Sequence, residues 1–198
     1  MSVPADRSRF EDMFDDEIAL RPGAGDWAPA IREVFIDLCV LLVETLARGG
    51  TLYVCGNGGS AAQAQHLAAE IVGRYRRERR PNSAVSLTVD TSALTALAND
   101  YGYEEIFRRQ AEGLMRPGDL LLGLSTSGTS PNVVRAVEWA REAGFTTAAL
   151  TGPQAGPLAA ATVCVAVGAG RTDLVQEQHL VLIHLLAEAA ERALVEAV

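Results

Sequence analysis

The stretch Thr51-Leu52-Tyr53-Val54-Cys55-Gly56-Asn57-Gly58-Gly59-Ser60 decides the fold class, because an apolar run passes directly into a glycine-rich polar loop. A second stretch has the same order: Leu120-Leu121-Leu122-Gly123-Leu124 precedes Ser125-Thr126-Ser127-Gly128-Thr129-Ser130. A strand, a Gly/Ser/Thr loop and a helix N-terminus together form an anion site, because backbone N–H groups, hydroxyls and the helix dipole all favour negative charge. One such loop could be an ordinary turn. Two of them favour a phosphorylated small molecule as the ligand.

Strands and helices alternate around these loops. The expected strands cover residues 51–55, 84–88, 119–124, 146–150 and 162–167. The expected helices cover residues 27–48, 60–74, 91–98, 103–114, 131–143 and 172–197. Nearly continuous apolar strands that alternate with helices are typical of a parallel sheet covered on both faces. The sequence therefore predicts an α/β, doubly wound, flavodoxin-like sandwich with five strands, which binds its ligand beyond the carboxyl ends of the strands.

The chain divides into a short N-terminal segment and one domain. Residues 1–26 are polar and acidic, and they contain one helical pattern before Pro22-Gly23. We expect this helical extension to pack on the domain or on a partner subunit, because it is too small to stand alone. Residues 27–198 form the domain, and the total of 198 residues suits one sizeable core.

Composition and charge exclude several classes of function. The formal net charge is −8, from 17 basic and 25 acidic residues, which argues against a general nucleic-acid-binding protein. No apolar stretch reaches the roughly 20 residues that span a bilayer, and the acidic N-terminus is unlike a signal peptide. Three cysteines, Cys39, Cys55 and Cys164, lie within apolar runs, as reduced thiols of a cytoplasmic protein do.

Two helices carry residues with catalytic chemistry. His66 and Glu70 are four residues apart, so they share a helix face and can bind a metal or act as an acid/base pair. For this motif alone, an ordinary surface His–Glu pair is the commoner explanation. In the last helix, His184 interrupts an apolar run, and Gln176 lies about two turns before it on roughly the same side. A buried imidazole needs a partner, which a carboxylate, a metal or a backbone carbonyl can supply.

Two further segments are less informative. The basic run Arg74-Tyr75-Arg76-Arg77-Glu78-Arg79-Arg80 is expected to end a helix, where cations offset the helix dipole and stay solvated. Asn99-Asp100-Tyr101-Gly102-Tyr103 is expected to separate two helices, either as a simple turn or as a loop whose Asp100 meets a sugar hydroxyl.

These residues resemble a known family. The segment from Cys55 to Ser60, with His66 and Glu70 beyond it, is similar to the phosphoheptose isomerase branch of the sugar isomerase (SIS) fold. The resemblance extends from about residue 27 to 190 and includes Asp90-Thr91-Ser92, Asn99-Asp100-Tyr101-Gly102-Tyr103, Arg116-Pro117-Gly118-Asp119, Ser125-Thr126-Ser127-Gly128, and Gln176-Glu177 with His179 and His184. The chain departs from the family pattern at Gln63, Thr129 and Gln178, beside the expected pocket.

The resemblance implies a homotetrameric enzyme that interconverts sedoheptulose 7-phosphate and D-glycero-D-manno-heptose 7-phosphate. Glu70 and His184 match the acid/base pair, and no nucleotide cofactor is expected. The positions that match the substrate site are Asn57, Gly58, Gly59, Ser60, Asp100, Ser125, Thr126, Ser127, Ser130, Asp173 and Gln176. The positions that match a zinc site of some members are His66, Glu70, Gln176 and His184. The expected partners are therefore a sugar phosphate and further copies of the chain, with no nucleic acid and no membrane.

Three other functions remain open at this point. A non-catalytic SIS relative that binds a partner protein would keep the fold and the second loop, Ser125–Ser130, called the serine loop below. The presence of Glu70, Gln176 and His184 favours an enzyme instead. A sugar-phosphate-sensing domain usually sits beside a DNA-binding segment, and residues 1–26 are too short and acidic for one. An isomerase of a related seven- or eight-carbon ketose phosphate, in antibiotic or surface-sugar synthesis, cannot be separated from the main interpretation by sequence.

Overall fold

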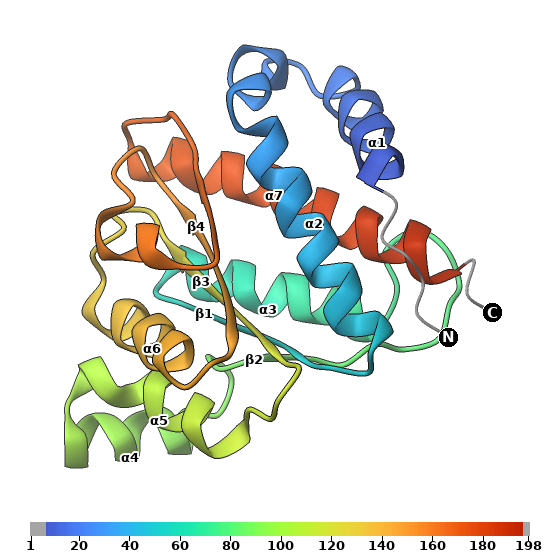
Figure 1. The fold of residues 1–198 in the computed structure, drawn as a ribbon. Coiled ribbons are helices and arrows are strands. Elements are labelled where there is room, and N and C mark those ends of the chain that lie inside the picture. Colours follow the sequence, from blue (N-terminus) through green and yellow to red (C-terminus); the bar gives the residue numbers. More distant parts are fainter. Residues whose placement is uncertain (1–6, 196–198) are drawn as a thin grey trace.

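A five-stranded parallel sheet forms the centre of the molecule (Figure 1). The computed structural model describes residues 7–195. The strands are β1 (Leu52–Gly56), β2 (Ala84–Ser86), β3 (Leu120–Ser125), β4 (Thr146–Thr151) and β5 (Val163–Ala166). They lie in the order β2-β1-β3-β4-β5, which is the flavodoxin-like order that the sequence predicts. The fold class is therefore confirmed.

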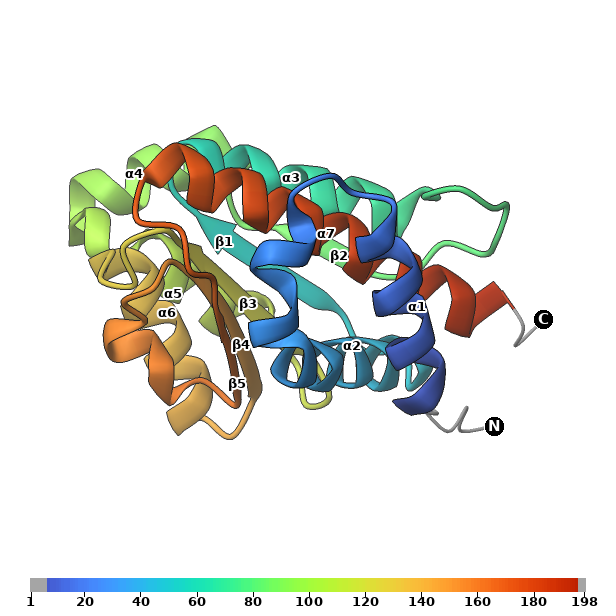
Figure 2. The ribbon, with the colours of Figure 1, turned by 90° about the horizontal axis from the view of Figure 1, so that it is seen from above.

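Helices cover both faces of the sheet (Figure 2). The α-helices are α1 (Arg7–Ala19), α2 (Arg32–Ala47), α3 (Gly59–Val72), α4 (Thr91–Tyr101), α5 (Ile106–Leu114), α6 (Pro131–Glu142) and α7 (Thr172–Val195). Alternate residues of β1 point to opposite faces: Leu52 and Val54 join a core with α1, α2, α3 and α7, whereas Tyr53 and Cys55 join a core with α5 and α6. The sheet thus separates two hydrophobic cores.

The N-terminal helix is part of the larger core. Phe10, Met13, Phe14 and Ile18 of α1 are buried against the α2 and α7 side of the sheet. This position agrees with the expectation that the extension packs on the domain. Residues 1–6 of that extension, and the last residues of the expected helix 172–197, lie outside the described residues.

Several element boundaries differ from the sequence prediction. The expected helix 27–48 divides into a 3₁₀ turn, Ala28–Ile31, with Pro29 at its start, and α2. The break expected over residues 99–103 begins only at Gly102, because α4 continues through Asp100 to Tyr101. Gly102 ends the helix with a φ of 95°, which only glycine adopts readily. The expected helix 60–74 ends at Val72, so the basic run follows α3 rather than ending it.

Four arginines of the basic run are exposed, as predicted, and Arg79 alone corrects the prediction that the run stays in solvent. Arg79 is only 8% exposed, and its guanidinium Nη2 donates to the Glu70 carbonyl at 2.6 Å. Burial lowers the pKa of Arg79, although the Glu191 carboxylate, 3.9 Å away, opposes this effect. The run thus joins α3 to β2 and packs Arg79 between α3 and α7. Its buried acidic partners on α7 had no signal in the sequence.

Among residues 7–195, no helix combines the length and the apolar character that a membrane span requires. The longest helix, α7, buries three ionisable residues, His179, Glu188 and Glu191, within its apolar run.

Candidate active site

The two polar loops lie side by side at the carboxyl edge of the sheet. Their strands are neighbours, and Gly56 at the end of β1 pairs with Leu124 near the end of β3. A Cβ at Gly56 would lie 2.9 Å from Ser60 Cβ and 3.0 Å from the Leu124 carbonyl oxygen, so only glycine allows this approach. The glycine therefore brings Ser60, in the first turn of α3, against the strand that leads to the second loop.

The second loop gathers hydroxyl groups at the start of α6. Ser125 Oγ lies 3.0 Å from Ser130 Oγ and 3.4 Å from Ser127 Oγ. Thr129 N donates to Ser127 Oγ at 3.3 Å, and Pro131 begins α6 directly after Ser130. These hydroxyls face a helix N-terminus, where backbone N–H groups and the dipole favour an anion. The geometry suits a phosphate group, as the sequence predicts.

A pair of asparagines lies next to this edge. Asn57 Nδ2 donates to Asn132 Oδ1 and Asn132 Nδ2 donates to Asn57 Oδ1, each at 2.8 Å. Tyr103 Oη donates to Asn57 Oδ1 at 3.1 Å. Asn57 and Tyr103 also line a hollow of about 120 Å³. Asn132 and a role for Tyr103 were not predicted from the sequence. Both residues orient the amide of Asn57, a predicted substrate-site residue.

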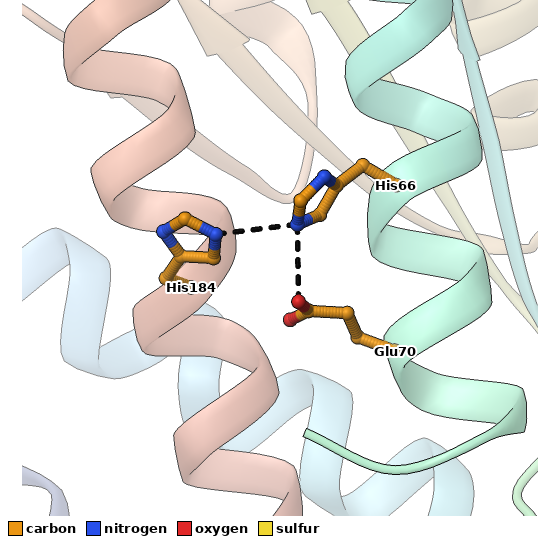
Figure 3. Close-up of side chains that lie close together, drawn as sticks. All are labelled: His66, Glu70 and His184. Atoms are coloured by element: carbon orange, nitrogen blue, oxygen red, sulfur yellow. Dashed lines mark hydrogen bonds and ion pairs between the residues drawn. The ribbon is translucent and has the colours of Figure 1, made fainter. Parts of the chain in front are cut away.

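His66, Glu70 and His184 converge between α3 and α7 (Figure 3). His66 Nε2 lies 3.0 Å from Glu70 Oε1 and 3.2 Å from His184 Nε2. The two imidazole rings meet nearly edge to face, with centroids 5.1 Å apart. The side chain of His66 is 42% exposed and that of Glu70 is 19% exposed. This cluster, the His–Glu cluster below, joins residues 118 positions apart in the chain.

Burial sets the protonation of the His–Glu cluster. Desolvation raises the pKa of Glu70, and the neighbouring His66 opposes this effect. Desolvation lowers the pKa of His184, as do the nearby His66, Arg21 and Arg76. Glu70 Oε2 is buried and has no hydrogen-bond partner among the described residues. An ionised Glu70 in this setting is a stronger base than an exposed carboxylate, and the neutral imidazole of His184 can both accept and donate a proton.

The His–Glu cluster also fits a metal ion. One ligand atom from each of His66, Glu70 and His184 lies within 4.8 Å of the others. Two imidazole nitrogens and a carboxylate oxygen are donors that zinc prefers. Two Nε2 atoms that face each other at 3.2 Å, with an unpartnered carboxylate oxygen nearby, leave lone pairs that a cation would satisfy. The residues present are thus compatible with zinc.

Gln176 lies elsewhere on α7, beside the first loop. A Cβ at Gly59 would lie 2.6 Å from Gln176 Nε2, and Gln63 Nε2 donates to the Gln176 carbonyl at 2.6 Å. The helical rise separates the backbones of Gln176 and His184 by about 12 Å. The structure therefore brings together three of the four predicted metal ligands, and it places Gln176 beside the first loop instead.

Asp100 and Asp173 are exposed, and the carboxylate of each accepts a hydrogen bond from a residue nearby in the sequence. Asn99 Nδ2 donates to Asp100 Oδ1 at 2.8 Å. Arg171 Nε donates to Asp173 Oδ1 at 3.1 Å, and this pairing lowers the pKa of Asp173. Their expected contacts with the sugar stay predictions.

His179 has a different environment from His184 on the same helix. Its ring is 0% exposed, and Nε2 donates to the Thr151 carbonyl, at the end of β4, at 3.1 Å. Gly152 N in turn donates to the Thr126 carbonyl in the serine loop at 3.2 Å. Burial lowers the pKa of His179 to about 4, so the ring stays neutral. His179 thus braces the strand end that supports the second loop.

Comparisons with known proteins identify the family of the chain. The SIS domain family model matches residues 31–152. The chain is 48% identical to the phosphoheptose isomerase of Akkermansia muciniphila over 94% of this chain and 95% of the relative. It is 51% identical to that of a Roseiflexus species over 82% of this chain and 83% of the relative.

Solved structures of similar proteins give the same result. The phosphoheptose isomerase of Neisseria gonorrhoeae superimposes with a TM-score of 0.78 at 39% identity, covering 93% of this chain and 98% of the other. The phosphoheptose isomerase of Francisella tularensis superimposes with a TM-score of 0.80 at 31% identity, covering 93% and 95%.

Proposed function

Because the chain belongs to the phosphoheptose isomerase family of SIS-domain proteins and is a sugar-phosphate isomerase, we propose that its substrate is sedoheptulose 7-phosphate. The product is D-glycero-D-manno-heptose 7-phosphate. The alternative substrate is a related seven- or eight-carbon ketose phosphate.

One observation supports the mechanism most directly: the His–Glu cluster joins a carboxylate and two imidazoles from helices whose N-terminal ends reach the substrate loops. Glu70 and His66 belong to α3, which begins at the first loop, and His184 belongs to α7, which contacts that loop through Gln176. A sugar held by its phosphate at the serine loop would extend along these helices toward the acid/base groups. Binding at the phosphate would then orient the reacting carbons.

Aldose–ketose isomerisation needs one base for carbon and one proton carrier for oxygen. In the proposed reaction, the Glu70 carboxylate removes a proton from C1 of the open-chain ketose, and the C–H electrons form the C1=C2 bond of an enediol as O2 gains a proton. Return of the proton from Glu70 to C2 and loss of the O1 proton produce the aldehyde. His184 donates the proton that O2 gains in the first step and takes up the proton that O1 loses in the second. No proton is gained or lost over the whole cycle.

We further propose that His66, Glu70 and His184 can hold zinc, which when bound would polarise the sugar oxygens. A cation beside Glu70 would lower the pKa of its carboxylate and weaken it as a base. Zinc content after purification should therefore be measured together with turnover before and after chelation. A metal-free protein with full activity would contradict an essential metal, and loss of activity that zinc restores would support one.

The experiment that tests the substrate is turnover of C5 to C8 ketose phosphates by the purified protein. We expect the highest kcat/KM on sedoheptulose 7-phosphate. Glu70→Gln, which removes the proposed base, should abolish most of this turnover. Its matched control is Glu78→Gln, because the Glu78 side chain is 90% exposed. A higher kcat/KM on another ketose phosphate would favour the alternative substrate, and no turnover of any would contradict the proposal.

We also propose that the chain assembles as a homotetramer. Large apolar side chains remain exposed on the single chain: Leu20, Val72, Val89, Tyr101, Tyr103, Leu114 and Leu174. Helix α4 buries none of its residues fully. Apolar surface of this kind is usually covered by another subunit in a closed symmetric assembly. Light scattering should give a mass of four chains, and an active monomer at micromolar concentration would contradict this proposal.

A further inference from the structure

A buried carboxylate on α7 holds the segment that follows α3. Glu191 is 0% exposed, and its carboxylate accepts hydrogen bonds from the backbone N–H groups of Tyr75, Arg76 and Arg77 at 2.9–3.1 Å. Three successive N–H donors on one carboxylate fix the backbone of a segment that has no regular secondary structure. The conformation of residues 75–77 is therefore set by a residue of α7.

The same segment places an aromatic ring on the His–Glu cluster. Tyr75 stacks on His184 with ring centroids 5.8 Å apart and an interplanar angle of 21°. The Arg76 guanidinium lies 4.8 Å from the centroid of the Tyr75 ring. His66 meets the His184 ring nearly edge on. The His184 imidazole thus has two aromatic contacts, one from α3 and one from the segment after it.

Further contacts attach this segment to the rest of the His–Glu cluster. Arg79, which lies 3.9 Å from Glu191, donates to the backbone carbonyl of Glu70 at 2.6 Å. Arg76 Nη1 lies 2.6 Å from Glu17 Oε1 on α1. Buried charges of this kind are strongly paired, because an unpaired buried charge is costly. The segment is consequently anchored at three helices rather than resting on the surface.

We propose that Tyr75 and Glu191 are positioning residues for His184: Glu191 fixes the backbone of residues 75–77, and the Tyr75 ring then fixes the plane of the imidazole. This inference rests on the proposed function, because it assigns His184 a role in catalysis. Proton transfer depends on the direction of the ring nitrogen, so a loose imidazole lowers kcat more than it weakens substrate binding. The contact needs the aromatic face of Tyr75 and makes no use of its hydroxyl.

Two substitutions at Tyr75 separate positioning from general stability. Tyr75→Phe keeps the ring, and kcat should stay within about 2-fold of the wild type. Tyr75→Leu removes the ring, and kcat should fall about 10-fold with KM changed less than about 2-fold. Glu78→Ala, in the same segment but with a side chain 90% exposed, is the control that should change neither value. A Tyr75→Leu variant with wild-type kcat would overturn the proposal.

A second readout does not depend on turnover. The chain has three histidines, so the imidazole signals in an NMR spectrum of protein labelled at histidine can be assigned by substitution. The stacked ring should shift the His184 signals, and this shift should disappear in Tyr75→Leu and persist in Tyr75→Phe. Glu191→Gln, if it folds, should also move the His184 signals and increase amide exchange at residues 75–77.

The two readouts distinguish failure of this inference from failure of the proposed function. If no ketose phosphate is turned over, the proposed function fails, and the His184 signals still decide whether Tyr75 sets the ring. If the wild type is active but His184 signals are the same in Tyr75→Leu, the positioning role is wrong. Signals that move without a change in kcat would also overturn it.

Discussion

Two histidines of α7, His179 and His184, lie less than two turns apart and have opposite environments. His179 is sealed in the core, and its Nε2 donates to the Thr151 carbonyl. His184 is partly exposed and faces His66 and Glu70 of α3. One ring has a backbone partner that holds it in a single state, whereas the other meets groups that can exchange protons or bind a metal.

The group that contacts the imidazole, rather than the residue type, separates a structural histidine from a reactive one. A carbonyl oxygen only accepts, so it keeps Nε2 of His179 protonated, and burial keeps the ring neutral. A second imidazole and a carboxylate leave the tautomer of His184 open. The following predictions test this distinction, beginning with the largest effect.

Removal of the reactive groups should have the largest effect on turnover. We expect His184→Ala and Glu70→Gln each to lower kcat at least about 100-fold, because each removes one of the two proton-transfer groups. Thermal unfolding should stay close to that of the wild type, since both side chains are partly exposed. Steady-state kinetics on the heptulose phosphate measures this. Near-full activity of either variant would show that the residue is not catalytic.

His179 should instead control stability at low pH. Its folded-state pKa of about 4 lies below the value of about 6.5 for an exposed histidine, so the unfolded chain binds the proton first. Stability is therefore full above pH 6.5 and is lost as the pH falls toward 4. Between pH 7.5 and 5, His179 should lower the free energy of unfolding by about 2 kcal/mol.

The matched variants for this prediction are His179→Gln and His184→Gln. Glutamine at position 179 can still donate to the Thr151 carbonyl but does not titrate, so denaturant unfolding at several pH values should show a shallower pH dependence. His184→Gln should change that dependence less, because the His184 ring is less buried. Equal pH dependence in the wild type and His179→Gln would contradict the assigned role.

The smallest effect on catalysis is expected for substitutions in the serine loop, which contacts the strand end that His179 holds. Ser127→Ala removes one of several hydroxyls around the proposed phosphate site, and kcat/KM should fall about 10-fold, with KM raised and kcat lowered together. Ser125→Ala should act in the same way. The Ser83→Ala variant, at a hydroxyl that pairs with Thr51 far from the loop, is the control. Unchanged kinetics in both loop variants would remove the loop from the substrate site.

The fold and the position of the loops could be predicted from the sequence, because both depend on local patterns. Apolar strands that alternate with helices indicate a parallel sheet, and the polar residues after β1 and β3 indicate the binding edge. The predicted neighbourhood of the two loops follows from the pairing of adjacent strands, which the register of Gly56 and Leu124 confirms.

Local patterns could not predict the contacts between α3 and α7, since these join residues more than 100 positions apart. Only the family resemblance grouped His66, Glu70 and His184. Spacing placed Gln176 and His184 on one side of α7, but it could not show that two helical turns leave only His184 beside His66. No role for Glu188 and Glu191 was predicted from the sequence. Their burial depends on arginines of a distant segment, and no local pattern reports such pairs.

The most direct test of the account is exchange of carbon-bound hydrogen with solvent. In D₂O the wild-type protein should incorporate deuterium at C2 of the aldose formed from sedoheptulose 7-phosphate, because the proton that Glu70 takes from C1 exchanges with solvent before a hydron returns to C2. Mass spectrometry and NMR should show that Glu70→Gln slows this incorporation at least about 100-fold, whereas Glu78→Gln does not. Incorporation at the wild-type rate in Glu70→Gln would contradict the claim that this carboxylate moves the carbon-bound proton.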